Sequence, residues 1–156
     1  MTWRGSTTVP DRIFASLPYL LPLVDGLAFG RFLFTQFPVL QLLLIPLAPL
    51  MQIYSLPFAS LIIFFALYLG VVRNENISHF IRFNAMQAIL LDIVLMLCRL
   101  VLQIFEGPQV AFIAETLYNM VFLGAFAAFV YAVVQSLLGR YAEIPPLSDA
   151  VYMQVR

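Results

Sequence analysis

Residues 79–105 form the stretch HFIRFNAMQAILLDIVLMLCRLVLQIF. It is long enough to cross a bilayer, because a membrane-spanning helix needs about 20 predominantly apolar residues. Polar side chains are nevertheless embedded in it, namely Asn84, Gln87, Asp92 and Arg99. Such side chains are costly in hydrocarbon and normally face the interior of a helix bundle. The stretch therefore predicts a membrane helix with one packed, polar face.

The composition of the whole chain supports a membrane protein. Of its 156 residues, 63% are hydrophobic and only 10% are charged, against about 25% charged residues in soluble domains. A soluble fold of this length needs a polar surface that this chain does not have, which excludes soluble enzymes and disordered regulators. All eight basic residues are arginine, they balance eight acidic residues, and none forms a basic run. We therefore expect no nucleic-acid partner.

Three further apolar stretches complete an all-α membrane domain that we predict over residues 13–138. Its four spans are expected at about 13–29, 53–72, 79–105 and 109–138. The link Glu106-Gly107-Pro108-Gln109 has the composition of a turn, so the last two spans should form an antiparallel hairpin. The remaining parts are expected to be a polar N-terminal tail, residues 1–12, and a solvated C-terminal tail, residues 139–156.

Residues 30–52, between the first and second spans, do not follow the pattern of a span. Their apolar run, VLQLLLIPLAPLM at 39–51, is short and contains Pro46 and Pro49. Each proline removes a helical hydrogen bond, and an unpaired backbone is tolerated in the membrane only against protein or at the interface. We predict an amphipathic interfacial or half-membrane segment on the outer face. A full additional span is the alternative.

The arginines predict the orientation of the four spans. With both termini on the cytoplasmic or stromal side, that side holds Arg4, Arg12, Arg73, Arg82, Arg140 and Arg156. The outer side holds Arg31 alone, with Arg99 buried near that end. Because arginine accumulates on the inner side of membrane proteins, this bias favours both termini inside.

The candidate functional residues are polar groups at membrane depth. Asp92 and Arg99 are seven residues apart and share one helix face. Counting from the turn at Gly107 places Glu115 at the depth of Arg99, so we expect these two to pair, and it places Asn119 within about one helical turn of Asp92. The set forms either a clamp that fixes the hairpin or a polar path for a solute, proton or peptide.

Chemistry of other kinds is not expected. The motifs HExxH, GxSxG and the P-loop are absent, and Asp25 with Asp92 lacks the context of an intramembrane protease. One histidine and one cysteine provide no metal-ligand cluster. We predict no catalytic residue, no cofactor and no metal.

Three stretches resemble a known family. They are LPYLLPLVDG with GRFLF at 17–34, PFASLIIFFALYL at 57–69, and VRNENISHFIRFNAMQAILLDI at 72–93. Together they resemble the twenty-kilodalton subunit family of the chloroplast inner-envelope (TIC) protein translocon and its cyanobacterial homologues. The most specific part is the last stretch, where Asn84, Gln87 and Asp92 occur in fixed order within a span.

The resemblance implies a four-helix membrane protein with both ends on the stromal or cytoplasmic side. It also implies contacts with other membrane subunits and with precursor polypeptides. The family has no agreed catalytic residues, so none is carried over. Because the N-terminus does not look like an organellar transit peptide, we expect a cyanobacterial form in the plasma or thylakoid membrane, whereas plant relatives occupy the chloroplast inner envelope.

Two function hypotheses follow. The first is a subunit of a protein-translocation machinery, as a channel-forming or a scaffold component. The second is a small-solute or ion transporter that uses the face of Asp92 and Arg99, which at this length would have to form a homo-oligomer. We find no inverted repeat of the kind common in transporters, and this favours the first hypothesis.

Overall fold

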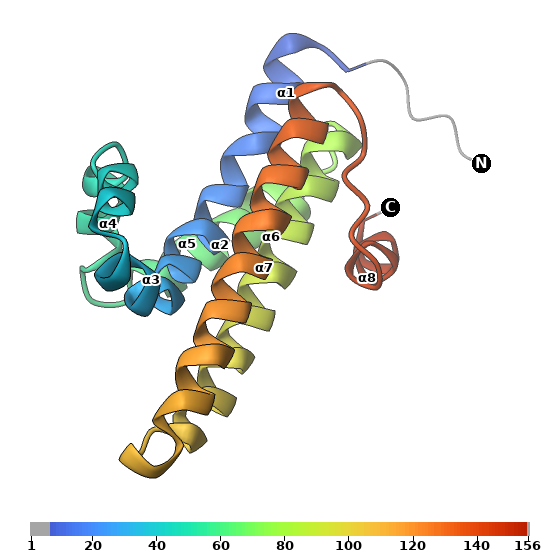
Figure 1. Cartoon of the computed structure of the whole chain (residues 1–156). Helices are drawn as coiled ribbons and strands as arrows, with labels where there is room; N and C mark the ends of the chain where they lie inside the picture. The colour runs from blue at the N-terminus through green and yellow to red at the C-terminus, as the bar shows by residue number, and fades with distance from the viewer. Residues whose placement is uncertain (1–6, 156) are drawn as a thin grey trace.

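A computed structural model describes residues 7–155, and this part of the chain consists of helices and connecting turns without a strand, in agreement with the predicted all-α class. Three long helical segments form a core, and a bent arm stands to one side of it (Figure 1). The α-helices are α1 (Val9–Ser16), α2 (Leu20–Leu27), α3 (Arg31–Gln36), α4 (Ala48–Tyr54), α5 (Ala59–Leu67), α6 (His79–Leu102), α7 (Ala111–Leu137) and α8 (Leu147–Gln154). Tighter 3-10 turns are η1 (Leu17–Tyr19), η2 (Ala28–Gly30), η3 (Pro38–Leu44), η5 (Gln103–Phe105) and η6 (Pro108–Val110), and η4 (Tyr68–Val72) is a π-helical turn.

The first long helix is longer than the predicted span 13–29. The elements α1, η1, α2, η2 and α3 run on without a break as one segment of 28 residues, Val9–Gln36. The helix begins earlier because Thr8 caps it: its side chain accepts a hydrogen bond from the Asp11 amide at 3.3 Å, and the Asp11 carboxylate accepts one from the Thr8 amide at 3.1 Å. It ends later because no proline interrupts it between Pro22 and Pro38.

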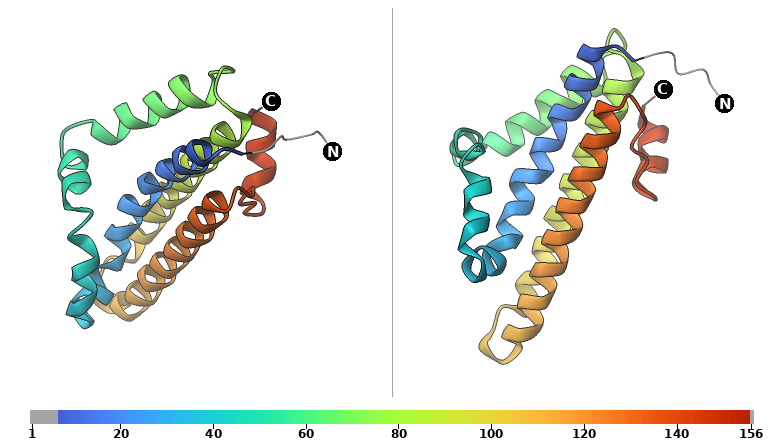
Figure 2. Two further views of the ribbon diagram at one scale, coloured as in Figure 1. Left: turned by 90° about the horizontal axis from the view of Figure 1, so that it is seen from above. Right: turned by 45° about the horizontal axis from the view of Figure 1, so that its top comes forward.

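The hairpin of α6 and α7 has the bounds that the sequence predicts. Candidate spans cover His79–Phe105 and Pro108–Leu137, and the two helices run in opposite directions from the turn that joins them (Figures 1 and 2). Their outer faces are apolar and exposed, as expected for side chains that meet lipid; Phe112 and Met120 are examples.

The segment between the first helix and α6 differs most from the prediction. The expected straight span at 53–72 is a bent pair, in which Ala48–Tyr54 and Ala59–Val72 meet at 99°. Pro57 lies in the break, and Phe58 adopts a left-handed conformation with φ of 62°. The residue before a proline avoids helical geometry, which explains why the helix stops here. Residues 30–52 are not one interfacial segment, because 31–36 extend the first helix and 48–52 belong to the bent pair.

The number of spans depends on this pair. Three helices of the described chain are long and apolar enough to cross a membrane, and there are four if the bent pair counts as one span. Arg82 Nε of α6 donates to the carbonyl of Val72 at 3.0 Å, so the arm ends where α6 begins. The arm therefore returns the chain from the far end of the first helix to the end that holds residue 7 (Figure 2).

The C-terminal segment is not a solvated tail. It contains α8, which packs against the start of α6, with Val151 and Val155 buried. The ring of Tyr152 lies over Phe83 with centroids 4.9 Å apart. The predicted polar tail 1–12 is also shorter, since α1 begins at Val9; residues 1–6 of it lie outside the described residues.

The first helix approaches α7 closely at two glycines. A Cβ added at Gly26 would lie 3.3 Å from Ala125 Cβ, and one at Gly30 would lie 2.8 Å from the Phe122 ring. Small residues let membrane helices approach each other, because dispersion contacts increase as the backbones come together. Gly124 on α7 differs, since nothing lies within 4 Å of its added Cβ.

We expect Gly26→Leu to separate the first helix from α7 and to destabilise the fold, since overpacking costs about 1–3 kcal/mol. Gly124→Leu is the matched control, because its side chain enters open space and has no neighbour to displace. Thermal unfolding in detergent micelles measures both variants. Equal midpoints for the two would show that the close approach at Gly26 does not stabilise the core.

Candidate functional site

Two polar clusters lie along the inward side of α6, and both involve the first long helix. The inner polar cluster consists of the side chains of Tyr19, Asn84, Gln87 and Ser136 with the backbone of Ala142 and Ile144. The acidic pocket is a cavity of about 260 Å³ whose polar lining consists of Asp25, Ser60, Asp92 and Arg99.

Tyr19 connects the first helix to α6 within the inner polar cluster. Its hydroxyl donates to Asn84 Oδ1 at 2.7 Å and accepts from Gln87 Nε2 at 2.8 Å. Asn84 Oδ1 also accepts from Ser136 Oγ of α7 at 3.1 Å, and Asn84 Nδ2 donates to the Phe80 carbonyl at 2.8 Å. Tyr19, Asn84, Gln87 and Ser136 are all fully buried. Their polar atoms are satisfied by protein, which is required where no water is available.

Gln87 extends the cluster to the segment that follows α7. Its Nε2 also donates to the Ala142 carbonyl, and its Oε1 accepts from the Ile144 amide at 3.4 Å. A turn at Gly139 brings the segment after α7 back to Gln87. Gly139 has a φ of 77°, and a Cβ added to it would lie 2.5 Å from Thr7 Oγ1. Only glycine fits such a position.

The local sequence explains how the cluster forms. Asn84 and Gln87 are three residues apart on α6, so they lie on one helix face in adjacent turns. Tyr19 lies in the tightened turn η1, which starts beside Pro18. Asn84 and Gln87 were predicted from the sequence as candidate polar residues, whereas Tyr19 and Ser136 were not. The only available signal was a tyrosine between two prolines inside a span, a position where its hydroxyl needs a buried partner.

The acidic pocket lies further along α6, between α6, α2 and α5. Asp92 is only 9% exposed, and its Oδ1 has no hydrogen-bond partner among the described residues. Asp25 of α2 and Ser60 of α5 line the same cavity. Two carboxyl groups thus share a small space with one guanidinium group, that of Arg99.

The predicted pair of Arg99 with Glu115 is wrong. Arg99 Nη2 donates to the backbone carbonyl of Asp25 at 3.4 Å, and its guanidinium carbon lies 5.8 Å from the ring centroid of Phe29. Arg99 was expected to be buried, but its side chain is exposed. Equal distance from the turn sets the depth of a residue but not its direction around the helix axis, and Arg99 faces the first helix.

The two remaining candidates on α7 lie apart from the acidic pocket. Glu115 lines a separate outer cavity together with Arg31 and Thr35. Asn119 has a buried Oδ1 without a hydrogen-bond partner in the described chain. The hydrogen bond that joins α6 to α7 is instead made in the inner polar cluster, between Asn84 and Ser136. No group of three or more His, Cys, Asp or Glu within residues 7–155 could hold a metal ion.

Nearly the whole described chain matches a known protein family. A family model described as "Chloroplast import apparatus Tic20-like" matches residues 7–151. The chain belongs to the Tic20-like family. The resemblance seen in the sequence is therefore confirmed.

The Tic20 relatives come from both cyanobacteria and plants. A Tic20 family protein of Synechocystis is 56% identical, over 94% of this chain and 93% of the relative. Protein TIC 20-II, chloroplastic, of Arabidopsis thaliana is 42% identical, over 99% of this chain and 78% of the relative. The Tic20 family protein Ycf60 of Porphyra purpurea is 33% identical, over 99% of this chain and 80% of the relative. The family match includes every residue of both polar clusters.

We expect Tyr19→Phe to destabilise this Tic20-like chain, because it removes a hydroxyl that donates to Asn84 and accepts from Gln87. Hydrogen bonds between membrane helices contribute about 0.6 kcal/mol on average and up to about 1.7, so we expect a loss near the upper value. Tyr131→Phe, at an exposed tyrosine of α7, is the matched control. Unfolding in mixed micelles measures both, and an unchanged stability of Tyr19→Phe would contradict a stabilising cluster.

Proposed function

We propose that this chain is a membrane subunit of a protein-translocation machinery that contacts polypeptide substrates and other membrane subunits. Membership of the Tic20-like family supports the role. The observation in the structure that carries the proposal is the arm of α4 and α5, which stands away from the three-helix core (Figure 2). Its apolar side chains are exposed on several sides; Leu56, Phe58 and Leu61 are examples. A surface of this kind suits contacts with further membrane segments.

We infer a shared path and not a pore enclosed by one copy. The core between the first helix, α6 and α7 is filled by large buried side chains such as Tyr19, Phe29 and Phe83. A packed core of this kind leaves little room for a polypeptide along its axis. The chain would instead contribute one wall, formed by α5, α6 and the acidic pocket, to a path completed by another subunit or a second copy.

We also propose that both termini lie on the cytoplasmic or stromal side. The bias of the arginines supports this orientation. By this reasoning the α6–α7 turn and the end of the first helix face the opposite side. The membrane we propose is a cyanobacterial plasma or thylakoid membrane, which the 56% identity to the Synechocystis relative supports.

We expect a photo-reactive amino acid at Leu61 or Met96, which line the acidic pocket, to form crosslinks to a polypeptide substrate and to other membrane subunits. The reason is that these positions lie on the proposed wall of the path. Leu123 of α7, 57% exposed on the outer face of the hairpin, is the control and should crosslink to lipid. The measurement is mass spectrometry of adducts formed in native membranes. Lipid adducts alone at all three positions would contradict the proposal.

A second candidate function is passage of an ion or small solute through the acidic pocket. The observation that favours it is the free Oδ1 of buried Asp92, which lines a cavity shared with Asp25 and Arg99. A buried polar atom without a partner destabilises a fold. Residues retained despite such a cost often have a functional role, particularly within the membrane.

We expect Asp92→Leu to unfold at the same temperature as the wild type or higher, because it removes a buried carboxyl oxygen that lacks a partner. Asp92→Asn keeps the size of the side chain and removes the charge. Ion flux into proteoliposomes then separates the two functions. Loss of flux in a folded Asp92→Asn variant supports an ion path, whereas unchanged flux contradicts it.

A further inference from the structure

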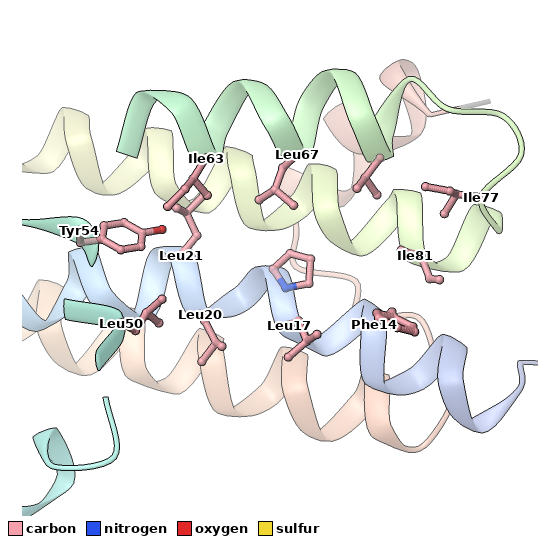
Figure 3. Close-up of a pocket in the computed structure, with 12 residues that line it drawn as sticks. Phe14, Leu17, Leu20, Leu21, Leu50, Tyr54, Ile63, Leu67, Ile77 and Ile81 are labelled. Atoms are coloured by element: carbon pink, nitrogen blue, oxygen red, sulfur yellow. The ribbon is translucent and has the colours of Figure 1, made fainter. Parts of the chain in front are cut away.

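A second, apolar cavity lies between the arm and the first long helix. Figure 3 shows its two walls, with α5 on one side and the helix of α1, η1 and α2 on the other. Leu17, Leu20 and Leu21 point into it from the first helix, and Ile63 and Leu67 point into it from α5. Tyr54 marks one end in this view, and Ile77 and Ile81 mark the other. Its volume is about 480 Å³.

The backbone holds this cavity open. The bend of 99° at residues 55–58 sets the direction of α5 away from the first helix. On its other side, α5 packs through Phe64 against the core cluster around Phe83 and Ile89 of α6, and the turn η4 continues this contact. Leu67 both contacts that cluster and lines the cavity, so the cavity lies beside this packing, between α5 and the first helix.

The chemistry of the lining excludes water as the occupant. Eleven of the twelve lining residues have purely hydrocarbon side chains, and Tyr54 is the exception. A water molecule in a cavity needs two to four polar partners, which this lining does not provide. An empty cavity of this size would deprive its walls of dispersion contacts on the side that faces the void. An apolar occupant would restore those contacts.

The size of the cavity selects the kind of occupant. Ligand cavities in proteins commonly measure about 300–1,000 Å³, and this cavity falls in that range. One turn of an α-helix, about 5 Å long and 10 Å across, already occupies roughly 400 Å³. A membrane-spanning helix of a partner or a substrate therefore does not fit, whereas a thin flexible chain does. The surrounding medium supplies such chains in excess.

We propose that one acyl chain of a bilayer lipid occupies this cavity. The acyl chain runs from the end at Ile77 and Ile81 toward Tyr54, between the walls formed by α5 and the first helix. At the Ile77 end, the neighbouring loop carries the exposed Arg73 and the polar Asn74, so a lipid headgroup there meets polar side chains at the edge of the membrane. The lipid takes the place of protein packing and supports the arm. This proposal does not depend on the translocation role.

A photoactivatable phosphatidylcholine with a diazirine in its acyl chain, incorporated in nanodiscs that hold the full chain, tests the location. We expect labelled peptides from the two walls of the cavity, at Leu17, Leu20, Ile63 and Leu67. We also expect native mass spectrometry to find one phospholipid retained per chain after detergent washing. Labels spread evenly over the outer faces of α6 and α7, with no retained lipid, would overturn the proposal.

Two neighbouring substitutions on α5 provide a matched pair. Ile63→Trp fills the cavity, whereas Ile62→Trp points away from it, at a side chain that is 63% exposed. We expect the retained lipid to fall at least about tenfold in Ile63→Trp, a difference of roughly 1.4 kcal/mol in binding, and to stay unchanged in Ile62→Trp. Leu17→Trp, on the opposite wall, should repeat the effect if Ile63→Trp folds poorly. Retained lipid in both filled variants, or a bound mass that belongs to a peptide or to a second copy, would overturn the proposal.

Discussion

Buried hydrogen bonds among Tyr19, Asn84 and Gln87 fix how the first helix packs against α6. In hydrocarbon, a polar group without a partner costs several kcal/mol, whereas the apolar side chains that surround it have no preference between lipid and protein. The apolar surfaces of these helices therefore do not select their own register. Three polar side chains can be satisfied together only when the first helix, α6 and the segment after α7 adopt one relative position.

The position of the acidic pocket follows from that register. The first helix and α6 run in the same direction, and Tyr19 bonds to residues 65 and 68 positions further along the chain. Two parallel helices keep a nearly constant offset, so Asp25 must lie close to Asp92, which is 67 positions further on. The two carboxyl groups share a cavity because the inner polar cluster aligns their helices. The hydrogen bonds that fix the helices are therefore made outside the acidic pocket.

Much of this architecture could be predicted from the sequence, and the errors have a common cause. The long helix at 79–105, the turn at Gly107 and the polar face of α6 depend on local composition and periodicity, which one sequence contains. The partner of Arg99 depends on how two helices are rotated about their axes, which depth along the hairpin does not determine. The role of Tyr19 likewise depends on a contact across 65 positions. The packing of α8 was missed because a short helix after two prolines has the composition of a loop.

The bent arm shows why the same chain combines a rigid part with one that is weakly packed. Pro57 and the left-handed Phe58, 76% exposed, prevent α4 and α5 from forming a straight span that would pack along its whole length. α5 then contacts the core through Phe64 and Leu67 and leaves a cavity between itself and the first helix. Segments with few buried contacts open at low free energy, while the hydrogen-bonded core remains closed. Local opening would therefore begin at α5, which lines both the acidic pocket and the apolar cavity. The hydrogen bonds of Tyr19 keep the opposite walls of both cavities in place during such a motion.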